Sequence, residues 1–105
     1  MQTAENYINA HFTESDCLTK AFENSGLSRR RFNDLFKNCF DITPNRYIIN
    51  LKIDYAKKLL QTEYINISQT AEICDFSDIY YFSKLFKKET GQTPAEYRKR
   101  THAQL

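Results

Sequence analysis

The segment Phe32-Asn33-Asp34-Leu35-Phe36-Lys37 recurs 50 positions further on as Phe82-Ser83-Lys84-Leu85-Phe86-Lys87. Upstream of both copies the offset falls to 49, since Gly26 is matched by Asp75. One residue has therefore been added in the second copy, and the sequence alignment places it just after Ser77. A repeat of this kind predicts that one small helical unit is used twice and presents two equivalent surfaces to one ligand.

The composition is that of a globular protein. The chain has 105 residues, of which 41% are hydrophobic and 27% charged, with eight Phe and seven Tyr. This length suffices for one domain, or for two very small ones that share an element. Two Gly and two Pro are too few for turn-rich β structure. No apolar run has the length of a membrane span, and no signal peptide is visible. We therefore expect an all-α cytoplasmic protein that does not contact a membrane.

The three cysteines argue against a metal site or a disulfide framework. Cys17, Cys39 and Cys74 are an odd number and widely spaced, and His11 and His102 lie far from them in the sequence. Cys39 and Cys74 fall at apolar positions of helical patterns. We expect them to be small buried residues in a reducing compartment, and we expect no metal or other cofactor.

Apolar residues at helical spacing predict seven helices. Thr43-Pro44 and Thr93-Pro94 each supply an N-cap and a proline suited to the first helical position. The expected ranges are 3–12, 18–24, 29–40, 44–62, a short helix from Asn66 or Ser68 to Cys74, 78–90 and a last helix from 94 that contains Tyr97. Residues 4–43 and 63–100 would then form two helical units, joined by a stiff linker helix over 44–62.

A tight turn precedes the third and the sixth of these helices. Gly26 can adopt the left-handed conformation that such a turn needs, and Asp75 tolerates it better than most residues. Ser28 and Ser77 are the expected N-caps of the helices that follow. Each unit therefore has a short helix, a tight turn and a second, capped helix.

The second helix of each unit has an apolar face and a polar face. Phe32, Leu35, Phe36 and Cys39 follow the i, i+3, i+4, i+7 spacing of a buried stripe. In the second copy this stripe contains the matching Phe and Leu residues. The residues expected to face outward are Arg30, Asn33, Asp34 and Lys37 in the first copy, and Tyr80, Ser83, Lys84 and Lys87, with Ile79 at the leading end, in the second.

Positive charge is concentrated after the first 25 residues. The whole chain carries a net charge of +2. Residues 1–25 hold four acidic and one basic side chain, a net charge of −3, so residues 26–105 carry +5. The basic clusters are 29–31, 84–88 and 98–100, and the first two belong to the helices with outward polar faces. This distribution favours an anionic partner.

The arrangement of short helix, turn and polar second helix is that of a helix-turn-helix motif, whose second helix enters the major groove of DNA. Its first residues lie nearest the base edges, here Arg29, Arg30 and Asn33 in the first copy. Arg can bond guanine and Asn adenine in bidentate fashion. Asp34 either accepts from cytosine N4 or forms a salt bridge within its own helix.

In the second copy the base-reading positions are less polar. Ile79 either packs on Phe82 or contacts a thymine methyl group. Tyr80 is expected to be exposed and Tyr81 to pack. The linker helix would be about 27 Å long, against about 34 Å between successive major-groove faces of B-DNA. Two different reading faces in one chain predict an asymmetric target bound without a dimer.

The chain resembles the C-terminal DNA-binding domain of AraC/XylS-family transcription regulators over residues 4–100. The most specific motifs are 76–78 with 81–88, then 90–94 and 96–98. Residues 56–60 resemble the linker helix of this family, and Leu27-Ser28 with Phe32 and 35–37 resembles its first helix-turn-helix. The chain departs from the family in having Asp75 in place of a usual Gly and Ile79 in place of a usual Pro.

The resemblance implies two homeodomain-like helix-turn-helix units that bind adjacent major-groove segments of a promoter in bacteria. It also implies a separate N-terminal effector or dimerisation domain in the full-length protein, and RNA polymerase as a partner of an activator. By position, the base-reading residues are Arg30, Asn33, Asp34, Ile79, Tyr80, Ser83 and Lys84. Three further arginines are phosphate-contact candidates, namely Arg31, Arg46 and Arg98, and the last two are either phosphate contacts or plain surface residues.

Two other classes of function are alternatives to DNA binding. An enzyme would need a nucleophile elbow, metal-ligand spacing, a phosphate-binding Gly loop or paired carboxylates, and the sequence offers none of these motifs. A protein-interaction module fits the modest net charge. Salt dependence separates this module from a DNA reader, because only DNA binding releases counterions from phosphates.

Overall fold

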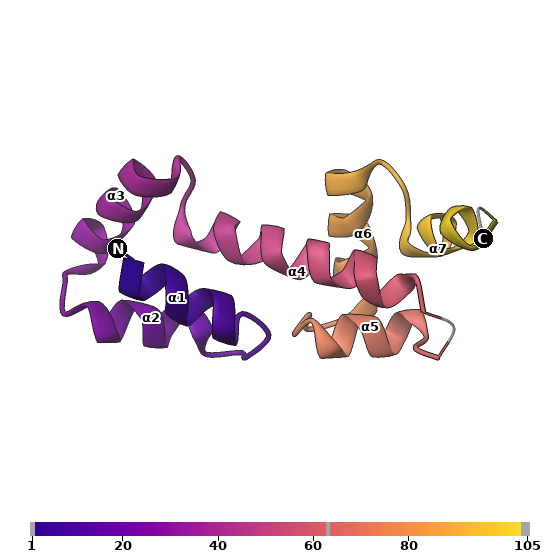
Figure 1. The fold of residues 1–105 in the computed structure, drawn as a ribbon, viewed down its shortest axis with the longest axis horizontal. Coiled ribbons are helices and arrows are strands. Elements are labelled where there is room, and N and C mark those ends of the chain that lie inside the picture. Colours follow the sequence, from indigo (N-terminus) through magenta and orange to yellow (C-terminus); the bar gives the residue numbers. More distant parts are fainter. Residues whose placement is uncertain (1, 63, 104–105) are drawn as a thin grey trace. The chain divides into compact units, whose positions relative to one another are not determined.

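The computed structural model describes residues 2–62 and 64–103, and within those residues the chain forms seven α-helices and no strand (Figure 1). This confirms the predicted all-α class. The helices are α1 (Gln2–His11), α2 (Cys17–Ser25), α3 (Arg29–Phe40), α4 (Pro44–Leu60), α5 (Ile67–Ile73), α6 (Ile79–Thr90) and α7 (Pro94–Ala103).

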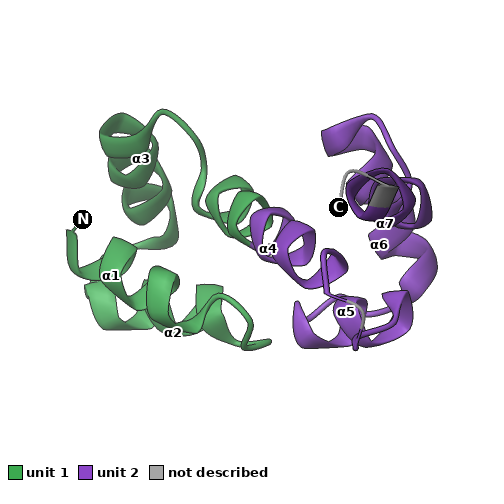
Figure 2. Ribbon diagram, turned by 45° about the vertical axis from the view of Figure 1, so that its right-hand side comes forward, with its two compact units in different colours: residues 1–51 green, residues 52–105 purple. Residues whose placement is uncertain are grey.

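The chain divides into two compact units within α4. Residues 1–51 form unit 1 and residues 52–105 form unit 2 (Figure 2). Ile48, on the first half of α4, belongs to the core of unit 1. Ala56 and Leu60, on the second half, are fully buried. The helix that the sequence marks as a linker thus supplies buried residues to both units, and it ends at Leu60, two residues earlier than expected.

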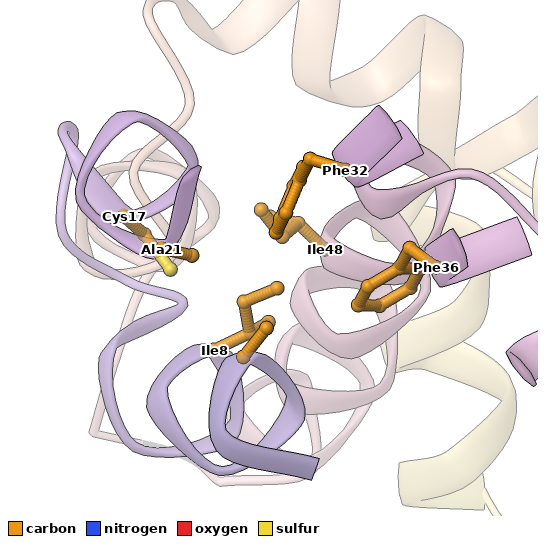
Figure 3. Packing of buried hydrophobic residues seen from close by; sticks show 7 residues of the cluster. Ile8, Cys17, Ala21, Phe32, Phe36 and Ile48 are labelled. Carbon is orange, nitrogen blue, oxygen red and sulfur yellow. The ribbon is translucent and has the colours of Figure 1, made fainter. Parts of the chain in front are cut away.

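The core of unit 1 is built from all four of its helical segments. In Figure 3, Ile8 of α1, Cys17 and Ala21 of α2, Phe32 and Phe36 of α3 and Ile48 of α4 point toward one another. Phe32 and Phe36 are 1% and 0% exposed, as the apolar stripe of this helix predicts. Burying these two rings fixes which face of α3 remains outside.

Unit 2 repeats this aromatic packing. The Phe36 and Tyr47 rings meet edge to face with centroids 5.4 Å apart, and the Phe86 and Tyr97 rings do the same at 5.4 Å. Phe82, like Phe32, is buried, and its ring lies 5.7 Å from that of Phe86. Edge-to-face contacts of this kind add to the burial of apolar area. They give a physical reason why Phe and Tyr are among the residues that are identical in the two copies.

Cys39 is exposed, so the prediction that it is buried was wrong. Cys39 lies in the last turn of α3, where Phe40 packs on the core instead. The Phe40 ring lies 4.6 Å from Phe36 and 5.7 Å from Tyr47. Cys17 and Cys74 are buried, and for Cys74 this confirms the prediction.

Left-handed residues close the turns, and Gly and Asp exchange places between the copies. Gly26 and Asp75 occupy the turn before the second helix with φ of 69° and 62°, as the sequence predicts. After that helix the order is reversed, with Asp41 at 64° and Gly91 at 83°. Each copy therefore uses one Gly and one Asp at the two positions that need a positive φ.

Lys52 stabilises the turn at Asp75. Its Nζ lies 3.2 Å from the Asp75 carbonyl oxygen and 3.4 Å from Oδ2, and 5.4 Å from the centroid of the Phe76 ring. The Lys52 and Asp75 side chains are 16% and 31% exposed. A partly desolvated pair of this kind offsets part of the cost of a left-handed Asp. The two residues are 23 positions apart, so no local pattern in the sequence indicates this contact.

The N-cap of α6 is Asp78, not Ser77 as predicted. Asp78 Oδ1 accepts from the backbone N–H of Tyr81 at 2.7 Å, just as Ser28 Oγ accepts from that of Arg31 at 3.2 Å. Ser28 and Asp78 are 50 positions apart, so the added residue of the second copy is Ser77, which precedes the cap. The offset is then 50 throughout α3 and α6.

Other helix starts agree with the sequence. Asn66 caps α5, in a capping box with Gln69. Thr93 and Glu96 form a second capping box before α7, with Thr93 N donating to Glu96 Oε1 at 2.9 Å. These hydrogen bonds lower the pKa of the Glu96 carboxyl. Thr43 caps α4 by accepting from Arg46 N at 3.2 Å.

Gly26→Ala should lower the free energy of unfolding by about 1 kcal/mol. A Cβ at this position would meet no atom within 4 Å, so the cost comes from the positive φ alone. Gly26→Asn should cost less, because Asn adopts this conformation more readily than Ala. Chemical denaturation of the three proteins measures the difference. Equal stability for the Ala and Asn variants would contradict this account of the turn.

Candidate nucleic-acid interface

The outward face of α3 lies opposite its two buried phenylalanines. Arg30, Asn33, Asp34 and Lys37 lie on this side of the helix, outside the core, as the sequence predicts. The Arg30 side chain is 94% exposed. None of these side chains is needed by the core, which leaves their hydrogen-bonding groups available for a ligand.

Asp34 forms a salt bridge within its own helix, which is one of the two roles that the sequence left open for it. Arg30 Nε lies 4.0 Å from Asp34 Oδ2, one helical turn away, and the Asp34 side chain is 65% exposed. Exposed pairs of this kind contribute about 0–1 kcal/mol. The Arg30 side chain can therefore leave this pair for another partner at little cost in free energy.

The other two arginines at the start of α3 differ from each other. The guanidinium carbon of Arg29 lies 4.7 Å from the centroid of the Phe22 ring, which holds this side chain against α2. Such a cation–π contact is worth about 0.5–1 kcal/mol at an exposed site. Arg31 is exposed. The three positive charges thus cover the beginning of α3 and its junction with α2.

The outward face of α6 is more aromatic. Tyr80 is 84% exposed, as expected, while Tyr81 is 48% exposed and packs only in part, with its ring 6.2 Å from that of Phe76. Lys84 and Lys87 are exposed and Ser83 is half-buried, so the predicted stripe is present on α6 as well.

Ile79 is half-buried at the junction of α5 and α6. It lines a small depression together with residues of α5, among them Ser68 and Ala71, and with Phe76 of the turn. This position lies at the edge of the exposed face of α6, whereas Tyr80, one residue later, is almost fully exposed. Of the two, Tyr80 extends further from the unit.

Arg98 ties two segments of unit 2 together. Its Nε donates to the Leu60 carbonyl oxygen at 3.0 Å, and its Nη2 donates to that of Ile65. These two carbonyls lie at the end of α4 and just before α5. The sequence could not reveal this contact, because the partners lie more than 30 positions away. Of the other two phosphate candidates, Arg31 is exposed and Arg46 is half-buried.

The described part of the chain contains neither a cluster of metal ligands nor a membrane span. Within residues 2–62 and 64–103, no group of three or more His, Cys, Asp or Glu side chains is placed to hold a metal ion. Over the same residues, no helix is long and apolar enough to cross a membrane.

Thiol reactivity provides a check of the side-chain placement. Burial raises the pKa of the Cys74 thiol to about 11, which keeps it protonated at neutral pH, and Cys17 is buried as well. Because the thiolate is the reactive form, only Cys39 should react rapidly with a thiol reagent in the native state. Cys39→Ser should remove the rapid phase. Three thiols reacting at one rate would contradict the placement of Cys39 on the surface.

Comparison with known proteins agrees with the predicted helix-turn-helix class. A protein-family model described as a helix-turn-helix domain matches residues 23–100. The HTH-type transcriptional regulator YijO of Escherichia coli K12 is 34% identical over 101 residues, which are 96% of this chain and 34% of that protein. The chain spans only 30–40% of the length of this and similar curated regulators.

Solved structures share the fold. A transcriptional regulator with an AraC-type DNA-binding domain from Chromobacterium violaceum is 28% identical, with a TM-score of 0.77 over 95% of this chain and 89% of that one. The DNA-binding domain of the transcriptional factor AdpA, solved in complex with a target DNA, has a TM-score of 0.89 over 96% of this chain and 91% of its own. At 23% identity, this second likeness concerns the fold alone.

Proposed function

Because the chain belongs to the AraC/XylS family of helix-turn-helix domains, we propose that it is the sequence-specific DNA-binding domain of a bacterial transcription regulator. In this proposal α3 and α6 are recognition helices, and they enter adjacent major-groove segments of one duplex. The rest of the regulator would be a separate N-terminal effector or dimerisation domain. The regulator would act in the cytoplasm and, if it is an activator, would contact RNA polymerase.

One observation supports this proposal most strongly. Each unit has a left-handed turn, an N-capped helix and a buried pair of phenylalanines that fixes the rotation of that helix. The same construction appears twice in one chain, and both times the outward face carries groups that can bind DNA. A helix held in this way keeps its outward side chains in a fixed orientation, as base recognition requires.

The residues of α3 have distinct proposed roles. Arg30 would bond guanine O6 and N7, and Asn33 would bond adenine N6 and N7. Asp34 would orient Arg30. Arg29, Arg31 and Lys37 would contact phosphates, which set position but carry no sequence information.

The residues of α6 and its surroundings complete the interface. Tyr80, Ser83 and Lys84 would face the bases, with Ile79 at the edge, and Lys87 would lie near a phosphate. Arg46 remains a candidate for a phosphate contact. Arg98 also remains a candidate for a phosphate contact, through the guanidinium N–H groups that do not bond the carbonyls of Leu60 and Ile65.

Salt dependence and point substitutions test the proposal. The duplex is first selected from a random pool with the wild-type chain. The logarithm of its binding constant should fall with the logarithm of salt concentration, with a slope of about −0.9 per phosphate neutralised. Arg30→Ala and Lys84→Ala should weaken binding, whereas Lys58→Ala, an exposed change on α4, serves as the control. If neither recognition-helix variant binds more weakly than the control, the assigned faces are wrong.

A further inference from the structure

The two proposed recognition helices begin with opposite chemistry. After its N-cap, Ser28, α3 starts with residues 29–31, which are three arginines. After its N-cap, Asp78, α6 starts with residues 79–81, which are Ile-Tyr-Tyr. The caps are equivalent, so these are the same three positions of the same scaffold. The first turn of α3 therefore carries three positive charges, and that of α6 carries none.

Tyr80 is the counterpart of Arg30 in this register. The two side chains are 84% and 94% exposed, so each extends from its helix at the position expected to lie deepest in the groove. Within the described residues, the Tyr80 ring stacks on no other aromatic side chain. Tyr81 beside it is 48% exposed. The leading end of α6 thus presents an exposed aromatic side chain, Tyr80, beside the partly packed Tyr81.

The chemistry of the major groove indicates what such a surface can read. The thymine C5-methyl is the apolar group among the base edges there, and apolar side chains contact it. Guanine is read best by the paired donors of Arg or Lys, which the first turn of α6 lacks. Lys84 and Lys87 lie further along the same helix and supply the positive charge that holds it to the backbone.

We propose that Tyr80 makes the half-site of α6 depend on thymine methyl groups, whereas α3 reads guanine and adenine through Arg30 and Asn33. This inference rests on the proposed function and adds the base chemistry of the second half-site. The two halves of the target then differ in kind, with methyl contacts in one and hydrogen bonds in the other.

Replacement of thymine by deoxyuridine tests the inference, because uracil keeps the base pairing and lacks only the methyl group. The duplex selected with the wild-type chain is made in both forms, and binding to each is measured. We expect the uracil duplex to bind less tightly, by about fourfold for each methyl group removed from the interface, as the burial of one CH₂-sized group implies.

Three variants assign the effect to a side chain. Tyr80→Phe keeps the ring and should keep the ratio of the affinities for the thymine and uracil duplexes. Tyr80→Ala should reduce that ratio toward one. Arg30→Ala should weaken binding to both duplexes and leave the ratio as in the wild type. As a control, Tyr64→Ala, which removes another exposed tyrosine of unit 2, should change neither the affinity nor the ratio.

A wild-type ratio in Tyr80→Ala would overturn the inference. Salt-dependent binding of the thymine duplex would then still support the proposed function, and Tyr80 would be free for a protein partner. Loss of the ratio in Tyr80→Phe would also overturn the inference, since it would assign the effect to the hydroxyl group. Absence of binding to any duplex would overturn both proposals.

Discussion

Replacing Phe82 by alanine should lower the free energy of unfolding by about 3–5 kcal/mol. The Phe82 side chain is fully buried, and its ring lies 4.9 Å from that of Phe76 and 5.7 Å from that of Phe86. Removing it leaves a cavity among rings that cannot close around the gap. Native proteins are stable by only about 5–15 kcal/mol, so the loss is a large share of the total. Urea denaturation followed by circular dichroism measures the change.

The repeat supplies a matched comparison for this variant. Phe32 occupies the equivalent position in unit 1 and is also buried, so Phe32→Ala should cost a similar amount. Tyr80→Ala, on the exposed side of the same helix as Phe82, should change stability by no more than about 0.5 kcal/mol. If Phe82→Ala lowers the free energy of unfolding by less than about 1 kcal/mol, the loss is too small for a buried phenylalanine. That result would contradict the placement of Phe82 in the core of unit 2.

Replacing Arg30 and Asn33 together by alanine should nearly abolish specific binding to the selected duplex. Each good bidentate contact with a base is worth about 1–3 kcal/mol of discrimination. The two substitutions together correspond to a drop in affinity of about 30-fold to 10⁴-fold, since about 1.4 kcal/mol is tenfold. Competition titrations on the selected duplex, at one salt concentration, measure this drop.

Binding of the same double variant to an unrelated duplex is the control. Non-specific binding comes from phosphate contacts, so it should fall much less than specific binding. Both side chains lie outside the core, which means that the fold should survive the change. An equal drop in affinity on both duplexes would show that Arg30 and Asn33 contact phosphates rather than bases.

The buried residues of the fold were predictable from the sequence because they are repeated. Phe32, Phe36, Phe82 and Phe86 recur at helical spacing and are all buried. Identity of Phe between the copies therefore marks residues that hold each unit together, whereas the identical pair Lys37 and Lys87 is exposed. Cys39 shows where this reasoning fails. Helical spacing does not reveal that the last turn of α3 lies beyond the core, where Phe40 makes the contact.

The turns were predictable in their conformation but not in their detail. Gly26 and Asp75 were expected to be left-handed, since few residues adopt a positive φ. The cap of α6 was assigned to Ser77 because it aligns with Ser28. Ser and Asp are both good N-caps, so the choice of Asp78 depends on geometry that only the structure shows.

Contacts between distant segments could not be predicted. Lys52 binds Asp75 from 23 positions away, and Arg98 binds the carbonyl of Leu60 from 38 positions away. Both cations looked like surface residues in the sequence, because nothing local distinguishes a structural Lys or Arg from a DNA-binding one. For Arg98, the two hydrogen bonds to backbone carbonyls leave fewer guanidinium N–H groups for a phosphate contact.

Hydroxyl-radical footprinting of the selected duplex tests the central claim most directly. Two recognition helices in adjacent major-groove segments should protect two segments with centres about 10 bp apart. Arg30→Ala should weaken protection of one segment, and Lys84→Ala that of the other. A single protected segment, or weaker protection of the same segment in both variants, would contradict the claim that this chain reads DNA with two helices.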